Sequence, residues 1–213
     1  MKFDVEEQLN AVERSVALLE RDGQPAATVT LAQSYPTTLH DLWDALTSSS
    51  RIPKWFLPIS GDLKLGGHYQ FQGNAGGTIV RCERPSLLEV TWEFGDQISW
   101  LEVHLVAEGE SNARFKLLHT ALITDHWHQF GPGAFGVGWE GGLLGLATHI
   151  LRPDEPKADE QTFHLTPEGK ALHIGSSERW CEAAIAAGEE PAQARAAANR
   201  TTAFYTGVPE GSE

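Results

Sequence analysis

Residues 87–122 read LLEVTWEFGDQISWLEVHLVAEGESNARFKLLHTAL, and apolar and polar residues alternate along this stretch with a period of two. Such alternation is typical of β-strands that bury one face. The turn signals Gly95-Asp96 and Glu108-Gly109 divide the stretch into three strands, at 87–94, 98–107 and 113–122. Because short turns join antiparallel neighbours, the stretch predicts the centre of an antiparallel sheet.

Further elements are predicted on both sides of this stretch. Earlier strands are predicted at 67–72 and 77–83, which makes five in succession, and at 27–33. Helices are predicted at 37–46 and, for a short second one, just before Pro53. Residues 134–151 form a long apolar segment with five glycines, and each glycine costs a helix about 1 kcal/mol relative to alanine. Either the backbone of residues 134–151 lies very close to the sheet, or the missing side chains leave space for another group to occupy.

The two ends of the chain carry amphipathic segments. Apolar residues spaced by four and three predict a helix over 4–20: Val5, Leu9, Val12, Val16 and Leu19. After an exposed linker at 152–165, helices are predicted to begin at Pro167 and at Pro191 and to form an αα-hairpin. Helices this short must bury their apolar faces. We expect them to cover part of the domain's exterior, and pairing across a homodimer is the alternative.

Composition excludes several classes of function. The chain has 16 Lys and Arg against 29 Asp and Glu, a net charge of −13, so nucleic acid is not an expected partner. No run approaches the ~18 apolar residues of a membrane span, and the first residues lack a secretory signal. A cytoplasmic protein is expected, with Cys82 and Cys181 as free thiols.

The predicted order of elements, one strand, two helices, five strands and a long helix, is that of the helix-grip fold. Five motifs carry a resemblance in this order and spacing: DLWDALT (41–47), KWFLP (54–58), GGHYQF (66–71), LEVTW (88–92) and KLLH (116–119). Together they resemble the START-like (SRPBCC) superfamily, in the branch of activator of heat-shock-protein-90 ATPase-like proteins. The segment FGPGAFGVGW (130–139) resembles a bacterial subgroup of that branch with a helical C-terminal tail.

This resemblance implies an α+β fold in which a curved antiparallel sheet wraps around a long closing helix, with extra helices at both termini. The expected organisation is an N-terminal helical extension (1–25), a START-like domain (26–151), and a linker with a C-terminal helical hairpin that packs on the domain (152–213). The resemblance also implies a cavity between sheet and helix, where some relatives bind lipids, hormones or polyketides and others catalyse cyclisation or dehydration. Co-chaperones of the branch carry a client-binding domain before this one, whereas only about 25 residues precede the first strand here.

Seven side chains are expected to face that cavity, and they are the predicted ligand-binding residues: Trp55, Tyr69, Phe71, Trp92, Phe115, His119 and Trp139. The predicted function is binding of a small apolar or aromatic molecule, without catalysis and without a cofactor. The alternatives are a cyclase- or dehydratase-type enzyme that uses His119, and a protein-interaction module. A plainly packed core is the simplest reading of each aromatic residue taken alone.

Histidines are the remaining candidates for chemistry. His119 is the one ionisable side chain placed on the inner face, where it is either a proton donor or a structural histidine. His126 and His128 invite a metal interpretation, with His119, His149 or His164 as a third ligand. No Cys, Asp or Glu completes a recognisable set, so no metal site is predicted.

Overall fold

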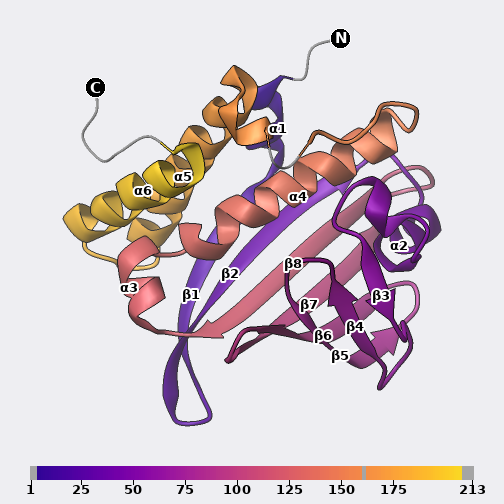
Figure 1. Cartoon of the computed structure of the whole chain (residues 1–213), viewed down its shortest axis with the longest axis horizontal. Helices are drawn as coiled ribbons and strands as arrows, with labels where there is room; N and C mark the ends of the chain where they lie inside the picture. The colour runs from indigo at the N-terminus through magenta and orange to yellow at the C-terminus, as the bar shows by residue number, and fades with distance from the viewer. Residues whose placement is uncertain (1–3, 160–161, 208–213) are drawn as a thin grey trace. The chain divides into compact units, whose positions relative to one another are not determined.

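The computed structural model describes residues 4–159 and 162–207 (Figure 1). The fold is α+β, with an eight-stranded antiparallel sheet in the order β1-β2-β8-β7-β6-β5-β4-β3. The strands are β1 (Glu13–Arg21), β2 (Gln24–Tyr35), β3 (Ile59–Gly61), β4 (His68–Phe71), β5 (Gly76–Glu83), β6 (Leu87–Phe94), β7 (Gln97–Ala107) and β8 (Ala113–Leu122). The helices are α1 (Val5–Ala11), α2 (Leu39–Thr47), α3 (Asp125–Phe130), α4 (Gly133–Leu151), α5 (Pro167–Ala186) and α6 (Pro191–Thr206), with 3₁₀ turns η1 (Ile52–Lys54) and η2 (Phe163–Leu165). This is the predicted helix-grip fold.

The chain divides into two compact units. Unit 1 comprises the described parts of 1–31, 122–141 and 158–213. Unit 2 comprises residues 32–121 and 142–157. Strand β2 and helix α4 each contribute residues to both units, and the two units are described separately below.

The register of β6, β7 and β8 fixes which residues share a face in unit 2. Val90 pairs with Leu101, and Leu101 pairs with His119. Residues directly opposite in antiparallel strands point to the same face, so these three side chains lie together. Trp92 pairs with Ser99 and therefore lies on that face too. The strands predicted at 87–94 and 113–122 are confirmed to the residue.

The prediction of one helix over 4–20 is wrong. Helix α1 ends at Ala11, and strand β1 follows it from Glu13 to Arg21. The reason lies in Asp22-Gly23, where both residues have positive φ, 52° and 76°. Two such residues form the tight turn of a β-hairpin, so β1 must pair with β2 rather than continue a helix.

Four short elements escaped prediction or changed type. Strand β3, helix α3 and the 3₁₀ turn η2 were not predicted, because each has too few residues for a periodic pattern. The short helix expected before Pro53 is the 3₁₀ turn η1, which contains that proline. Both helices predicted after the linker are present as α5 and α6, and Gly188 at φ 101° makes the turn between them.

Unit 1 is organised around a buried ion pair. The Arg14 guanidinium on β1 donates two hydrogen bonds of 2.6 Å to the Glu140 carboxylate on α4. Trp180 Nε1 on α5 donates to the same carboxylate at 2.8 Å. Remaining donors of Arg14 reach the carbonyl oxygens of Leu9 and Val12. The side chains of Arg14 and Glu140 are only 7% and 1% exposed, so one salt bridge connects a strand to two helices.

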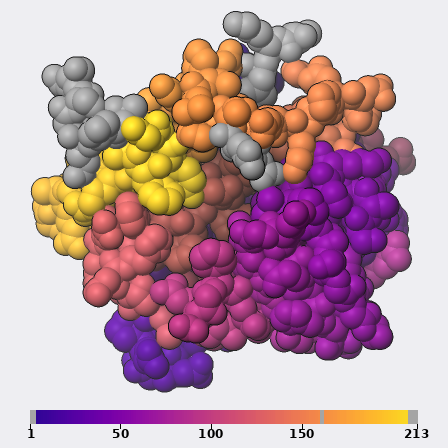
Figure 2. All heavy atoms as spheres, in the orientation of Figure 1, coloured from indigo at the N-terminus to yellow at the C-terminus, as the bar shows by residue number. Residues whose placement is uncertain are grey.

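Helix α6 also contacts α3 in unit 1, and the two segments lie side by side at the surface (Figure 2). The Thr201 hydroxyl donates to the Phe130 carbonyl at 3.0 Å, and Arg200 Nε donates to the Gln129 carbonyl at 2.6 Å. These bonds satisfy carbonyl groups at the end of α3 that have no partner within so short a helix. The α6 surface is thereby fixed to α3.

Most glycines of α4 allow close approach by neighbouring residues. In unit 1 a Cβ at Gly136 would overlap the Trp180 indole. In unit 2 a Cβ at Gly145 would overlap the carbonyl oxygen of Trp55, whereas one at Gly142 would make an ordinary 3.6 Å contact with the Phe56 ring. Gly141 has no atom within 4 Å of its Cβ position. Of the two explanations offered for these glycines, close packing holds at Gly136 and Gly145.

We predict opposite effects for alanine at two of these positions. Gly145→Ala is expected to lower the free energy of unfolding by ~2 kcal/mol or more, because the new Cβ meets backbone that has to move. Gly141→Ala is expected to raise it by ~0.5–1 kcal/mol through helix propensity alone. Urea unfolding of both variants tests this. Equal effects at the two positions would contradict the account of close packing.

The buried ion pair gives a second prediction. Glu140→Gln is expected to cost ~3–5 kcal/mol of unfolding free energy, because the Arg14 charge then stays buried without a counter-charge. The matched control is Glu178→Gln, which removes the exposed partner of Arg195 and is expected to cost less than ~1 kcal/mol. Comparable losses in the two variants, measured by thermal or urea unfolding, would show that the buried pair does not organise unit 1.

Candidate functional site

A continuous series of aromatic rings lies on the inner face of the sheet in unit 2. It begins with Trp55 and Phe56 after η1, whose ring centroids are 5.4 Å apart. Phe56 meets Phe71 of β4 at 5.0 Å, edge to face. Phe71 lies 5.7 Å from Trp92 of β6, and Trp92 lies 6.3 Å from His119 of β8. We call this series, together with Tyr69, 5.5 Å from Phe71, the aromatic cluster.

Local structure positions each ring. Trp55 and Phe56 follow the turn η1, and Trp55 Nε1 donates to the Ala45 carbonyl of α2 at 2.9 Å. The turn is held from the other side by Arg51, which bridges Asp41 at 2.7 Å and donates to His149 Nε2 of α4 at 3.3 Å. Figure 1 shows α2 beside the C-terminal end of α4. The cluster is thus held between β-strands and a turn anchored to two helices.

The pKa values of Asp41 and His149 agree with their contacts to Arg51. The Arg51 hydrogen bond lowers the pKa of Asp41. Burial and the neighbouring Arg51 charge lower the pKa of His149, so this imidazole is neutral and its Nε2 accepts from Arg51. The Asp41 carboxylate and the neutral His149 imidazole therefore both accept hydrogen bonds from the Arg51 guanidinium, which lies between them.

Polar atoms of Tyr69 and His119 are hydrogen-bonded within the chain. The Tyr69 hydroxyl donates to the Thr91 carbonyl at 2.7 Å. His119 Nε2 lies 2.8 Å from Ser99 Oγ, and that hydroxyl donates to the Trp92 carbonyl at 3.1 Å. Since a hydroxyl has one hydrogen, this pattern is satisfied when His119 carries its proton on Nε2.

Burial differs sharply within the cluster. His119 is 2% and Tyr69 is 4% exposed. Trp55, Phe56, Phe71 and Trp92 are only half-buried. Large aromatic side chains in a packed core are usually more fully covered than this. The cluster therefore presents aromatic surface that its own neighbours do not completely enclose.

Burial also decides the charge of His119, because desolvation lowers its pKa to about 3. The imidazole is neutral throughout the physiological pH range. It is poorly suited to act as a general acid at neutral pH, since efficient proton donors have pKa values near the working pH.

The structure brings together five of the seven predicted site residues and adds two. Trp55, Tyr69, Phe71, Trp92 and His119 belong to the aromatic cluster. Phe115 is on the same face but four residues along β8 from His119, about 13 Å at the rise of a strand, and it is 4% exposed. Trp139, half-buried on α4, lies in unit 1 and stays a predicted site residue.

The two residues that the sequence prediction missed are Phe56 and Ser99. Phe56 follows Trp55 in an irregular segment, where strand alternation assigns no face. Ser99, in contrast, was detectable, because it alternates with Ile98 and Trp100 and so points inward with Leu101.

The metal interpretation of His126 and His128 meets a geometric obstacle. Both lie on helix α3, where residues two apart point in nearly opposite directions, about 200° around the axis. His126 instead contacts the Phe130 ring at 4.9 Å. Within residues 4–159 and 162–207, no group of three His, Cys, Asp or Glu side chains is arranged to hold a metal ion. No helix in those same residues is both long and apolar enough to cross a bilayer.

Comparison with known proteins agrees with this geometry. Residues 36–151 match the family model described as activator of Hsp90 ATPase homolog 1-like protein. The chain belongs to this family. It thereby falls in the activator of heat-shock-protein-90 ATPase-like branch of the START-like superfamily. No curated protein matches the chain.

Solved structures extend the comparison. The crystal structure of CalU16 from Micromonospora echinospora is 29% identical, with a TM-score of 0.66, over 84% of this chain and 99% of CalU16. That match extends beyond residues 36–151. An HSP90 activator from Plasmodium falciparum is 20% identical, with a TM-score of 0.51, over 58% of this chain and 95% of its own. A conserved protein of unknown function from Enterococcus faecalis is 14% identical, with a TM-score of 0.59, over 87% and 96% of the two chains.

The depressed pKa of His119 predicts a pH effect on stability. Below about pH 6.5 the unfolded chain binds a proton at this histidine, whereas the folded chain does not until about pH 3. Stability is therefore lost as pH falls through this window, by about 3 kcal/mol between pH 8 and pH 4 from this residue alone. In His119→Gln that part of the pH dependence should disappear.

The measurement is the free energy of unfolding in urea at several pH values. The comparison uses the slope of stability against pH, so any constant cost of the substitution cancels. His173, whose pKa burial lowers to about 4, contributes to both proteins alike. Parallel curves for the wild type and His119→Gln would contradict the burial assigned to His119.

Proposed function

We propose that the aromatic cluster binds a small apolar or aromatic molecule. The observation that carries the proposal is that four large aromatic side chains of the cluster, Trp55, Phe56, Phe71 and Trp92, stay half-buried. Ligand sites are typically lined by apolar and aromatic surface with few polar groups. Residues of this cluster come from four separate parts of unit 2, as expected for the wall of a site.

The state of the polar groups supports an apolar ligand. Tyr69 and Trp55 donate their hydrogens to carbonyl oxygens of the chain. His119 is neutral and bonded to Ser99. A strongly polar or charged ligand would lose its hydration against such a surface without equivalent new bonds. An apolar or aromatic ligand loses little hydration energy when it binds, and it gains contact with the aromatic rings.

The same groups weigh against the enzymatic alternative. Catalysis of a cyclisation or dehydration needs a group that exchanges a proton at neutral pH. Burial keeps the pKa of His119 near 3. Burial also raises the pKa of Tyr69, with a further increase from the nearby Glu93 charge. Neither residue is poised for proton transfer, which favours binding without chemistry.

The test uses N-phenyl-1-naphthylamine, an uncharged aromatic probe whose fluorescence rises in apolar surroundings. Trp92→Ala is expected to weaken its binding about tenfold, equivalent to ~1.4 kcal/mol of lost contact. The variant should lose less than the ~3–5 kcal/mol of stability typical for a tryptophan in a fully packed core.

Trp100→Ala is the matched control, because Trp100 lies on the next strand and on the opposite face from Trp92. Its binding of the probe should equal that of the wild type. The proposal fails if Trp92→Ala binds the probe as tightly as the wild type, or if both variants lose binding equally.

A further inference from the structure

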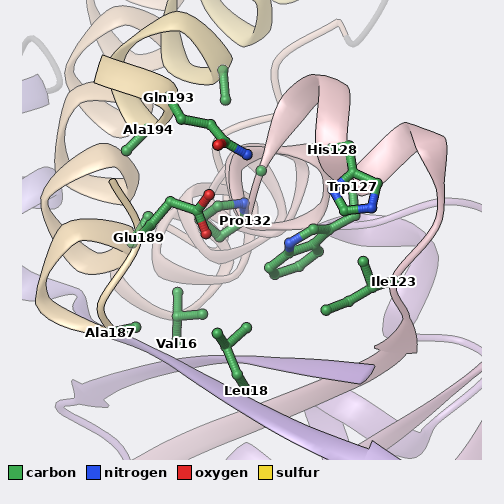
Figure 3. A pocket seen from close by; sticks show the side chains of 13 residues that line it. Val16, Leu18, Ile123, Trp127, His128, Pro132, Ala187, Glu189, Gln193 and Ala194 are labelled. Atoms are coloured by element: carbon green, nitrogen blue, oxygen red, sulfur yellow. The ribbon is translucent and has the colours of Figure 1, made fainter. Parts of the chain in front are cut away.

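A pocket of about 140 Å³ lies in unit 1 and shares no residue with the aromatic cluster (Figure 3). Strand β1 contributes Val16 and Leu18, and Ile123 and Trp127 line it from the segment around α3. The remaining wall comes from the end of α5, the turn after it and the start of α6. An apolar cavity of about 150 Å³ is large enough to admit benzene, so this pocket suits a ligand of roughly that size.

The pocket combines an apolar wall with one carboxylate. Alanines of α5 and α6 form much of its surface, and the Trp127 indole, 6% exposed, is part of the wall. Glu189, in the turn between the two helices, is half-buried. Figure 3 shows the Glu189 carboxylate and the Trp127 indole extending toward one another from opposite sides of the pocket. Gln193 and His128 add polar groups at its edge.

Glu189 differs from Glu140, the fully buried acidic side chain of this unit described above. The Glu140 carboxylate is paired with Arg14. The backbone N–H of Glu189 donates to the Ala184 carbonyl at 3.0 Å, but its carboxylate forms no ion pair with any residue of 4–159 or 162–207. A carboxylate that borders an apolar cavity attracts a cation more strongly than one in open water, because the surrounding dielectric constant is lower.

Three features therefore select the same kind of ligand. The carboxylate of Glu189 attracts a cation, and the Trp127 indole offers an aromatic surface to an apolar stem. The apolar wall favours a hydrocarbon or aromatic stem. The whole chain has a net charge of −13, which concentrates cations near its surface. We propose that this pocket binds a small primary amine with an aromatic or alkyl stem, its ammonium group at Glu189 and its stem against Trp127.

This proposal is independent of the function assigned to the aromatic cluster, since the two sites share no residue. The probe is 2-phenylethylamine, with 2-phenylethanol and phenylacetate as neutral and anionic analogues of nearly the same shape. Binding to the full chain at neutral pH is followed by the ¹H–¹⁵N signal of the Trp127 indole, which the Trp127→Phe variant identifies. The amine is expected to shift this signal at concentrations at least about tenfold lower than the alcohol or the acid require.

Two variants test the role of the carboxylate. Glu189→Gln is expected to weaken amine binding about tenfold and to leave binding of the alcohol unchanged. Glu182→Gln, an exposed residue on α5 outside the pocket, is the matched control and should bind all three probes like the wild type. Ala187→Leu, which fills part of the pocket, is expected to abolish the Trp127 shift.

The proposal is overturned by any of three results. The alcohol or the acid binds as tightly as the amine, Glu189→Gln binds the amine like the wild type, or the amine leaves the Trp127 signal unmoved. Circular dichroism and the unfolding midpoint of each variant show whether it is folded. If Glu189→Gln does not fold, Glu189→Ala with the same three probes replaces it.

Discussion

The close approach of Trp55 to helix α4 is the constraint on which the candidate site depends. The carbonyl oxygen of Trp55 occupies the space where any side chain at residue 145 would begin, so only glycine fits there. Phe56 follows Trp55 directly, and its ring lies 3.6 Å from the position that a Cβ at residue 142 would take. Arg51, which contacts Asp41 and His149, holds the same turn. A helix that is intrinsically weakened by glycine thus gains contacts that position the first rings of the aromatic cluster.

The aromatic cluster suits an apolar ligand because its buried polar groups are uncharged. Polar atoms of Trp55, Tyr69 and His119 bond to the chain itself, and the neutral His119 adds no charge to the site. Unit 1 uses the opposite solution, because it buries the charges of Arg14 and Glu140 and compensates each by hydrogen bonds. A paired buried charge can organise helices and strands, but it leaves no polar group for a ligand. Glu189 of that unit combines a half-buried carboxylate with an apolar pocket.

Sequence patterns predicted the central sheet well and the rest less evenly. Strands β6 and β8 match their predicted bounds because long alternation and clear turns define them. Strand β1 was predicted as helix, since its valine and leucine spacing fits both periods, whereas the Asp22-Gly23 turn makes it the first strand of a hairpin. Inward-facing site residues on strands, such as Trp92 and His119, could be found from alternation. Phe56 could not, because its position depends on tertiary contacts around an irregular turn.

Tertiary contacts also decide the role of the glycines in α4, which the sequence left open between close packing and space for a ligand. A sequence shows that side-chain volume is missing, but only packing shows whether a neighbour or a ligand uses the space. The most direct measurement is a crystal structure of the protein with N-phenyl-1-naphthylamine. The account predicts electron density for the probe in contact with the rings of Phe71 and Trp92, beside a neutral His119 still bonded to Ser99. Density for the probe elsewhere, with those two rings fully covered by other side chains, would contradict it.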